Sequence, residues 1–137
     1  MVSIKSVLAS ALAALPLSSA YISSMTAPAT AKSGSNITVT LTASIYVQNW
    51  DDFGIVWGLA PDTWNCGDIT CVGQRIAYTP LFPDHVPQPG NFTIDVPVPE
   101  SFDAGNYNLV AAIPYLVGAS GMTLIQNHTA AIEVTAA

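Results

Sequence analysis

A short motif, Asp103-Ala104-Gly105-Asn106-Tyr107, constrains the fold of this chain most strongly. In Greek-key sandwiches a D-x-G-x-Y spacing marks a corner between sheets, and its tyrosine hydrogen-bonds to backbone a few residues upstream. We assign Tyr107 to that position. Gly105 is expected to supply a backbone conformation that is costly for residues with a Cβ, and Asp103 to bond its own backbone in the turn. The motif predicts an immunoglobulin-like sandwich.

Apolar and polar residues alternate through much of the chain, as they do in strands with one buried face. The clearest alternating segments are residues 35–43, 53–59, 91–98 and 127–135. Turn-forming residues separate the segments, and no amphipathic helix of useful length follows residue 20. Strands with this spacing predict an all-β, antiparallel Greek-key sandwich of about seven strands.

Several local features refine this expectation. Trp57 falls in register with Phe53, Ile55 and Leu59 on the apolar side of its alternating segment, so we expect it in the core. Residues 49–52 are predicted to form a turn, and Pro114 is predicted to end the strand that follows the corner. Four prolines within residues 79–90 predict an extended, semi-rigid loop that crosses between strands.

The first twenty residues have the features of a secretory signal peptide. Lys5 precedes an apolar run, Val7 to Leu17, which is too short to span a bilayer, and Ser18-Ser19-Ala20 ends in small residues that a signal peptidase reads. We expect cleavage after Ala20 and a single mature domain of residues 21–137. The alternative, an N-terminal anchor, would need a longer apolar span, so no membrane insertion is expected.

The charge balance argues against two classes of partner. The chain has nine acidic and three basic residues, and only Lys32 and Arg75 of the basic ones follow the signal peptide. So few cations cannot neutralise a run of phosphates, which argues against nucleic-acid binding and against attraction to anionic lipid. Charged residues make up 9% of a chain that is half hydrophobic, so we expect Ser, Thr, Asn and attached sugar to cover its surface.

Three N-x-T sequons begin at Asn36, Asn91 and Asn127. Each asparagine lies on the polar side of an alternating segment, so all three are expected to face solvent in the same strand registers that bury the apolar residues. Because we also expect secretion, the sequence predicts N-linked glycosylation at the three sites.

The two cysteines, Cys66 and Cys71, lie close together in the chain. In an oxidising compartment the default is a disulfide, and the short loop it closes limits its stabilising effect to about 2 kcal/mol. Such a bond pins a loop and does not hold the fold. A zinc site needs about four ligands, and the C-x-x-C spacing of redox pairs is absent, so we predict no metal and no cofactor.

No catalytic arrangement is recognisable in the sequence. His85 follows Asp84, but adjacent residues in an extended chain point to opposite sides, and no G-x-S-x-G or H-E-x-x-H motif completes a site. We expect His85 to be a solvated loop residue and the protein to have no enzymatic activity.

Five segments, in the same order and across essentially the whole mature chain, resemble the necrosis-inducing secreted (Nis1-like) family of fungal effectors. They are YISS at 21–24, IYVQNWDDF at 45–53, GIVWGLAP at 54–61, GNFTIDVP at 90–97 and GNYNL at 105–109. The Cys66 to Cys71 loop departs from the family's pattern, which would alter the choice of partner if that loop lies in the interface.

The resemblance implies a small secreted protein that binds plant immune receptor-like kinases and suppresses pattern-triggered immunity, with cell death in some hosts. The candidate partners it implies are the co-receptor kinase associated with brassinosteroid and flagellin receptors and related cytoplasmic kinases. It is compatible with action outside the plant cell and with translocation into it. It implies no catalytic residues.

Two functions from different classes follow. A binding effector would use the 61–90 region, with Trp50 and Trp64, in loop-like segments, as exposed aromatic anchors. The alternative is a non-catalytic cell-wall or carbohydrate-associated sandwich module, whose exposed aromatic residues would bind sugars. The C-terminal residues 133–137 carry no hydrophobic tail, which disfavours a lipid-anchored wall protein. We expect a monomer.

Overall fold

The computed structural model describes residues 19–137, which form nine strands and contain no helix, and therefore none that could cross a membrane. The strands are β1 (Ser19–Thr26), β2 (Thr30–Lys32), β3 (Asn36–Tyr46), β4 (Trp50–Asp52), β5 (Gly54–Pro61), β6 (Gln74–Pro80), β7 (Gly90–Pro97), β8 (Gly105–Val117) and β9 (Met122–Thr135). Most of the predicted signal peptide lies outside the described residues. Its last two residues, Ser19 and Ala20, begin β1 and pair with Tyr46 and Ile45.

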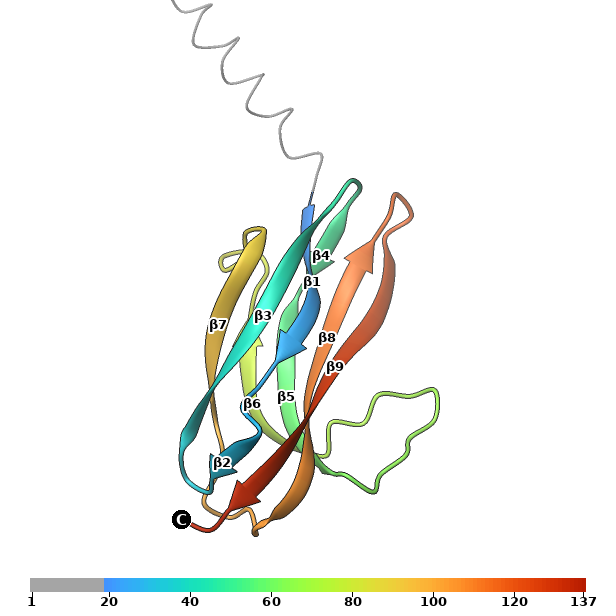
Figure 1. The fold of residues 1–137 in the computed structure, drawn as a ribbon. Helices are drawn as coiled ribbons and strands as arrows, with labels where there is room; N and C mark the ends of the chain where they lie inside the picture. The colour runs from blue at the N-terminus through green and yellow to red at the C-terminus, as the bar shows by residue number, and fades with distance from the viewer. Residues whose placement is uncertain (1–18) are drawn as a thin grey trace, which may run out of the picture.

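The strands form two sheets that pack face to face (Figure 1). One sheet has the order β1-β3-β7, and the other has the order β2-β9-β8-β5-β6, with β4 also paired to β8. All pairs are antiparallel except β2 with β9. The predicted all-β sandwich is confirmed. Seven of the strands are seven residues or longer, in agreement with the predicted number, and β2 and β4 add three residues each. The immunoglobulin-like classification stays a prediction.

The core lies between the sheets, where alternate residues of each long strand face inward. Trp57 is fully buried, as predicted, and its indole Nε1 donates a hydrogen bond to Thr79 Oγ1 at 2.9 Å. The other large side chains that are fully buried are Ile22, Val39, Leu41, Ile55, Leu59, Val96, Val98, Leu109, Ile113 and Val134.

The predicted corner is present. Tyr107 Oη donates a hydrogen bond to the main-chain oxygen of Asp103 at 3.0 Å, so the tyrosine holds the turn that precedes β8. The expectation for Gly105 was wrong. Its φ is not positive, and an added Cβ would meet only the Tyr107 ring, at 3.7 Å, because Gly105 already belongs to the extended backbone of β8. The Asp103 carboxylate makes no hydrogen bond within residues 19–137, so Asp103 contributes its carbonyl.

Two other local predictions were also wrong. Residues 49–52 were expected to be a turn, but Trp50 to Asp52 form β4, which pairs with the end of β8. Pro114 was expected to end a strand, but β8 continues through it to Val117. Pro114 lies where the neighbour of β8 changes from β5 to β4, and its carbonyl accepts the Phe53 N–H at 2.9 Å. A missing N–H is tolerated at such a junction.

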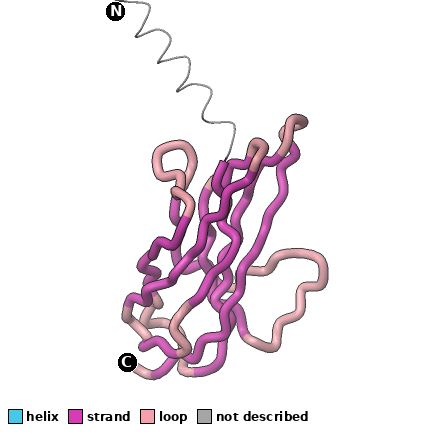
Figure 2. Tube along the Cα trace, turned by 45° about the horizontal axis from the view of Figure 1, so that its top comes forward, coloured by secondary structure: helices cyan, strands magenta, loops and turns pink. Residues whose placement is uncertain are grey.

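Two long connections leave opposite ends of the sheets (Figures 1 and 2). Residues 81–89 cross from β6 in one sheet to β7 in the other, as predicted, and lie at the same end as the β3–β4 turn. The predicted extended conformation was wrong, because residues 82–85 form a turn. Residues 62–73 join the adjacent strands β5 and β6 at the other end and project on the outer side of the larger sheet. We refer to residues 81–89 as the proline loop and to residues 62–73 as the disulfide loop.

Candidate functional site

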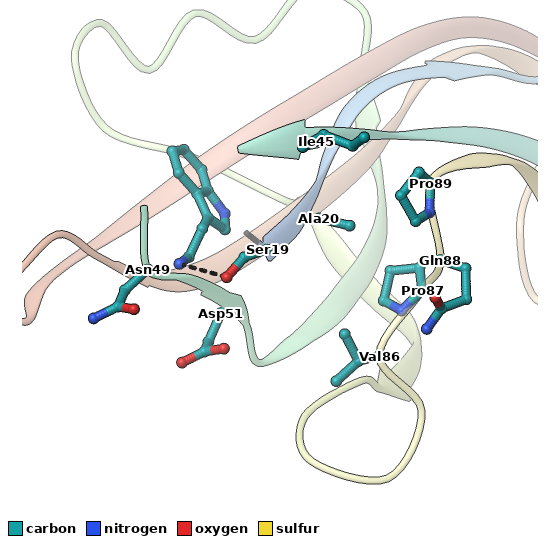
Figure 3. Close-up of a pocket in the computed structure, with 10 residues that line it drawn as sticks. Ser19, Ala20, Ile45, Asn49, Asp51, Val86, Pro87, Gln88 and Pro89 are labelled. Carbon is teal, nitrogen blue, oxygen red and sulfur yellow. Dashed lines mark hydrogen bonds between the residues drawn. The ribbon is translucent and has the colours of Figure 1, made fainter. Parts of the chain in front are cut away.

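A cleft of about 490 Å³ opens at the end of the sandwich where β1 begins. Its walls come from the start of β1, the end of β3, the residues around β4 and the proline loop, whose side chains line a common space (Figure 3). We call it the Trp50 cleft. The lining residues are Ser19, Ala20, Ile45, Asn49, Trp50, Asp51, Val86, Pro87, Gln88 and Pro89. Ser19 and Ala20 precede the predicted cleavage point, so the other eight residues would bound the cleft in the mature protein.

Trp50 belongs to a cluster of four aromatic rings. Its ring stacks on Tyr115 of β8 with centroids 4.4 Å apart and an angle of 1° between the planes. The Tyr21 and Tyr46 rings lie 4.7 and 5.0 Å from it. Aromatic pairs at such distances stabilise each other beyond the area they bury. Trp50 is therefore half-buried and fixed in orientation, and is not the freely exposed loop residue that the sequence suggested.

The Asp52 carboxylate fixes the orientation of the Trp50 indole by a hydrogen bond. Its Oδ1 accepts hydrogen bonds from Trp50 Nε1 at 2.8 Å and from Gln126 Nε2 at 3.2 Å, and its Oδ2 accepts the Ile22 N–H at 2.8 Å. The carboxylate thus joins β4 to β1 in the opposite sheet and to β9 in its own. Only 4% of Asp52 is exposed, and this burial raises the pKa of its carboxyl, although the three donors and nearby His128 oppose the shift.

The titratable groups near the cleft do not form a recognisable catalytic or metal site. His128 Nε2 is buried and has no hydrogen-bond partner within residues 19–137. No group of three or more His, Cys, Asp or Glu side chains in this part of the chain could hold a metal ion. His85 is exposed in the proline loop, as predicted, and so is Asp84.

The proline loop is anchored beside β4. The main-chain N–H groups of Leu81 and Phe82 both donate to the carbonyl of Phe53, at 3.0 and 3.2 Å, and the Leu81 side chain is buried in the core. The His85 N–H closes a turn onto the Leu81 carbonyl at 2.7 Å. Val86 remains 42% exposed at the cleft. Of residues 61–90, the contact region predicted from the sequence, the proline loop therefore lines the cleft and the disulfide loop does not.

The disulfide loop carries the other predicted anchor. Cys66 and Cys71 form the predicted disulfide, with Cα atoms 6.1 Å apart. Trp64 is 54% exposed. The base of the loop passes so close to β5 that a Cβ on Gly73 would collide with the Leu59 carbonyl, and the φ of Gly73 is +72°. Only glycine fits there without strain.

The three sequon asparagines are exposed, as predicted. Asn36 and Asn91 lie on the outer face of the three-stranded sheet, where Thr42 Oγ1 donates to Asn91 Oδ1 at 2.8 Å. Asn127 lies on the outer face of the larger sheet, in β9. Their glycosylation stays a prediction.

The Nis1 family model matches residues 18–133. The chain belongs to the Nis1 family. It is 30% identical over 129 residues to necrosis-inducing secreted protein 1 of Colletotrichum orbiculare, which covers 93% of this chain and 77% of that protein. The resemblance inferred from the sequence segments is confirmed, and the predicted secretion agrees with this relative, whose name describes a secreted protein. The match to the Nis1 family spans both the Trp50 cleft and the disulfide loop.

In this Nis1-family protein the two predicted anchors are not brought together. Trp50 lines the cleft at one end, whereas Trp64 lies on the loop that leaves the other end of β5. Sequence reasoning missed Asp52, Gln126 and Tyr115 as supports of Trp50. A weak signal was available, because Asp52 stands directly before a strongly apolar strand and an acid there needs a partner if it is buried.

Proposed function

We propose that this Nis1-family protein is a secreted fungal effector that binds plant immune receptor-like kinases and suppresses their signalling, with host cell death in susceptible plants. The observation that carries the proposal is the family match, which extends over residues 18–133. We further propose that the protein acts by binding and catalyses no reaction.

The Trp50 cleft is the surface that we assign to the kinase. Its aromatic wall is already held by Tyr115 and Asp52. Pro87 and Pro89 restrict the backbone of its other wall, so little side-chain or loop ordering opposes association. Ile45 is 64% exposed and Val86 42% exposed at its rim. A fixed aromatic residue surrounded by exposed apolar side chains is typical of an interface centre.

The test is a pull-down of the secreted protein, produced in an oxidising eukaryotic host, against the cytoplasmic kinase domains of plant immune co-receptors. Autophosphorylation is measured in the same reaction. We expect saturable binding and reduced phosphorylation. A folded, disulfide-bonded protein that binds none of the kinases would contradict the partner.

Matched substitutions locate the contact. Ile45→Asp and Val86→Asp place a charge at the rim of the cleft, and Ile69→Asp places one on the disulfide loop, where Ile69 is 71% exposed. Burying an unpaired charge in an interface costs several kcal/mol, so we expect the first two variants to lose binding at least about tenfold and the third to bind normally. Equal binding by all three variants would exclude the cleft.

A further inference from the structure

A small hollow lies between the disulfide loop and the outer face of the larger sheet, at the opposite end from the Trp50 cleft. Its volume is about 180 Å³. The loop supplies Trp64 and Asn65, and the sheet supplies Asn108 of β8 with Asn127 and Thr129 of β9. We call it the loop hollow. Ala60 and Val110 also line it, and their exposed fractions are only 4% and 3%.

Two of these residues, Asn127 and Thr129, are the first and third residues of one sequon. Asn127 is the acceptor of Asn127-His128-Thr129, and Thr129 supplies the hydroxyl that the sequon requires. Both side chains are exposed. Because residues two apart in a strand face the same side, both lie on the same face of β9. A sugar attached to Asn127 would therefore begin within the hollow. The other sequons lie on the outer face of the smaller sheet.

The lining suits a neutral, polar ring. No charged side chain lines the hollow, and Trp64 offers a flat indole that is 54% exposed. Asn65 Oδ1 already accepts the Gly67 N–H at 3.1 Å, which leaves its amide N–H groups free to donate to a sugar hydroxyl or acetamido oxygen. The volume is below the roughly 300–1,000 Å³ of sites that enclose drug-sized ligands, so it fits one sugar residue.

We propose that the first N-acetylglucosamine of a glycan on Asn127 is bound in the loop hollow, where its apolar face packs on Trp64 and holds the disulfide loop against the sheet. The glycan then covers Trp64, and the Trp50 cleft is left as the aromatic surface open to a protein partner. This inference depends on glycosylation and is independent of kinase binding.

The test compares the three glycans of one protein. The chain is secreted from a host that adds high-mannose glycans, and endoglycosidase H, which cuts next to the first sugar, is applied under native conditions with release at each site followed by mass spectrometry. A contact worth about 1.4 kcal/mol slows release about tenfold. We expect that delay at Asn127 relative to Asn36 and Asn91, and equal rates after denaturation.

Variants assign the delay to Trp64. Trp64→Ala should bring the rate at Asn127 to that at the other sites, and Trp64→Phe should keep most of the delay. An unoccupied Asn127, or equal native rates at all three sites of the wild-type protein, would overturn the proposal.

A second measurement does not depend on the glycosidase. Thr129→Ala removes the sequon and keeps Asn127, and we expect hydrogen exchange of residues 62–73 to become about tenfold faster without the glycan. Unchanged exchange in the loop would also overturn the proposal.

Discussion

Trp50 and Trp64 look alike in the sequence, but the fold uses them differently. Trp50 is stacked on Tyr115, bonded to Asp52 and surrounded by strands of both sheets. Trp64 is 54% exposed on a connection that is closed by the Cys66–Cys71 disulfide and belongs to neither sheet. A recognition residue of the first kind cannot be changed without changing stability, whereas one of the second kind can. The two regions should therefore respond differently to the same substitution.

The largest contrast is expected for alanine. Replacing a buried Trp costs about 3–5 kcal/mol, and because Trp50 is half-buried we expect Trp50→Ala to lower the free energy of unfolding by about 3 kcal/mol. Trp64→Ala should change it by no more than about 0.5 kcal/mol. Urea denaturation of the non-glycosylated proteins measures both. Similar losses at the two positions would remove the contrast.

The second prediction concerns the disulfide. Replacing Cys66 and Cys71 together by alanine should cost about 2 kcal/mol, because the closed loop is short. We expect faster hydrogen exchange in residues 62–73 and unchanged protection around Trp57. Loss of protection in the core would mean that the disulfide loop supports the fold, against the distinction drawn above.

The third prediction concerns the Tyr107 corner, which lies beside the disulfide loop. Tyr107 and Trp64 line a common hollow of about 330 Å³, yet Tyr107 belongs to β8. Tyr107→Phe removes one hydrogen bond to the Asp103 carbonyl and should cost about 1 kcal/mol in the free energy of unfolding. The exposed Tyr78→Phe is the control and should have little effect. Equal stability of Tyr107→Phe and wild type would show that the corner bond contributes nothing.

The features that the sequence predicted are the ones encoded locally. Trp57 and the sequon asparagines follow the two-residue period of a strand, and the Tyr107 bond spans only four residues. The disulfide was equally local. These features could be read from neighbouring residues without knowledge of the topology.

The Trp50 cleft could not be read in that way. β4 has three residues, and its partners come from distant parts of the chain, since Asp52 bonds Ile22 across 30 residues and Gln126 across 74. Pro114 is tolerated within β8 only because the neighbouring strand changes there. Composition predicted a stiff proline loop, but the crossing between sheets places that loop beside Trp50. The site therefore depends on topology that no short segment contains.

The smallest predicted effect is a pH dependence that only the Trp50 region should show. Burial raises the pKa of Asp52 above its value in the unfolded chain, so folding favours the protonated carboxyl. The contribution of this group to stability is then fully present below the unfolded value, about 3.9, and is lost as the pH rises through the folded value. Asp52→Asn removes this titration. The variant also perturbs the bonds to Trp50, Gln126 and Ile22, which adds a cost that does not change with pH.

We therefore expect the difference in unfolding free energy, wild type minus Asp52→Asn, to fall as the pH rises above about 4, the unfolded pKa of the carboxyl. Denaturant titrations at several pH values measure it, and all other acids cancel between the two proteins. Asp68→Asn, in the disulfide loop, is the matched control, because Asp68 is exposed and its loss leaves the buried carboxylate in place. A difference that is constant or rises with pH would mean that the three donors outweigh burial. In that case the ionised Asp52 carboxylate would stabilise the folded protein while it binds the Trp50 indole. Otherwise its ionisation destabilises the fold, and the hydrogen bond to Trp50 is kept at that cost.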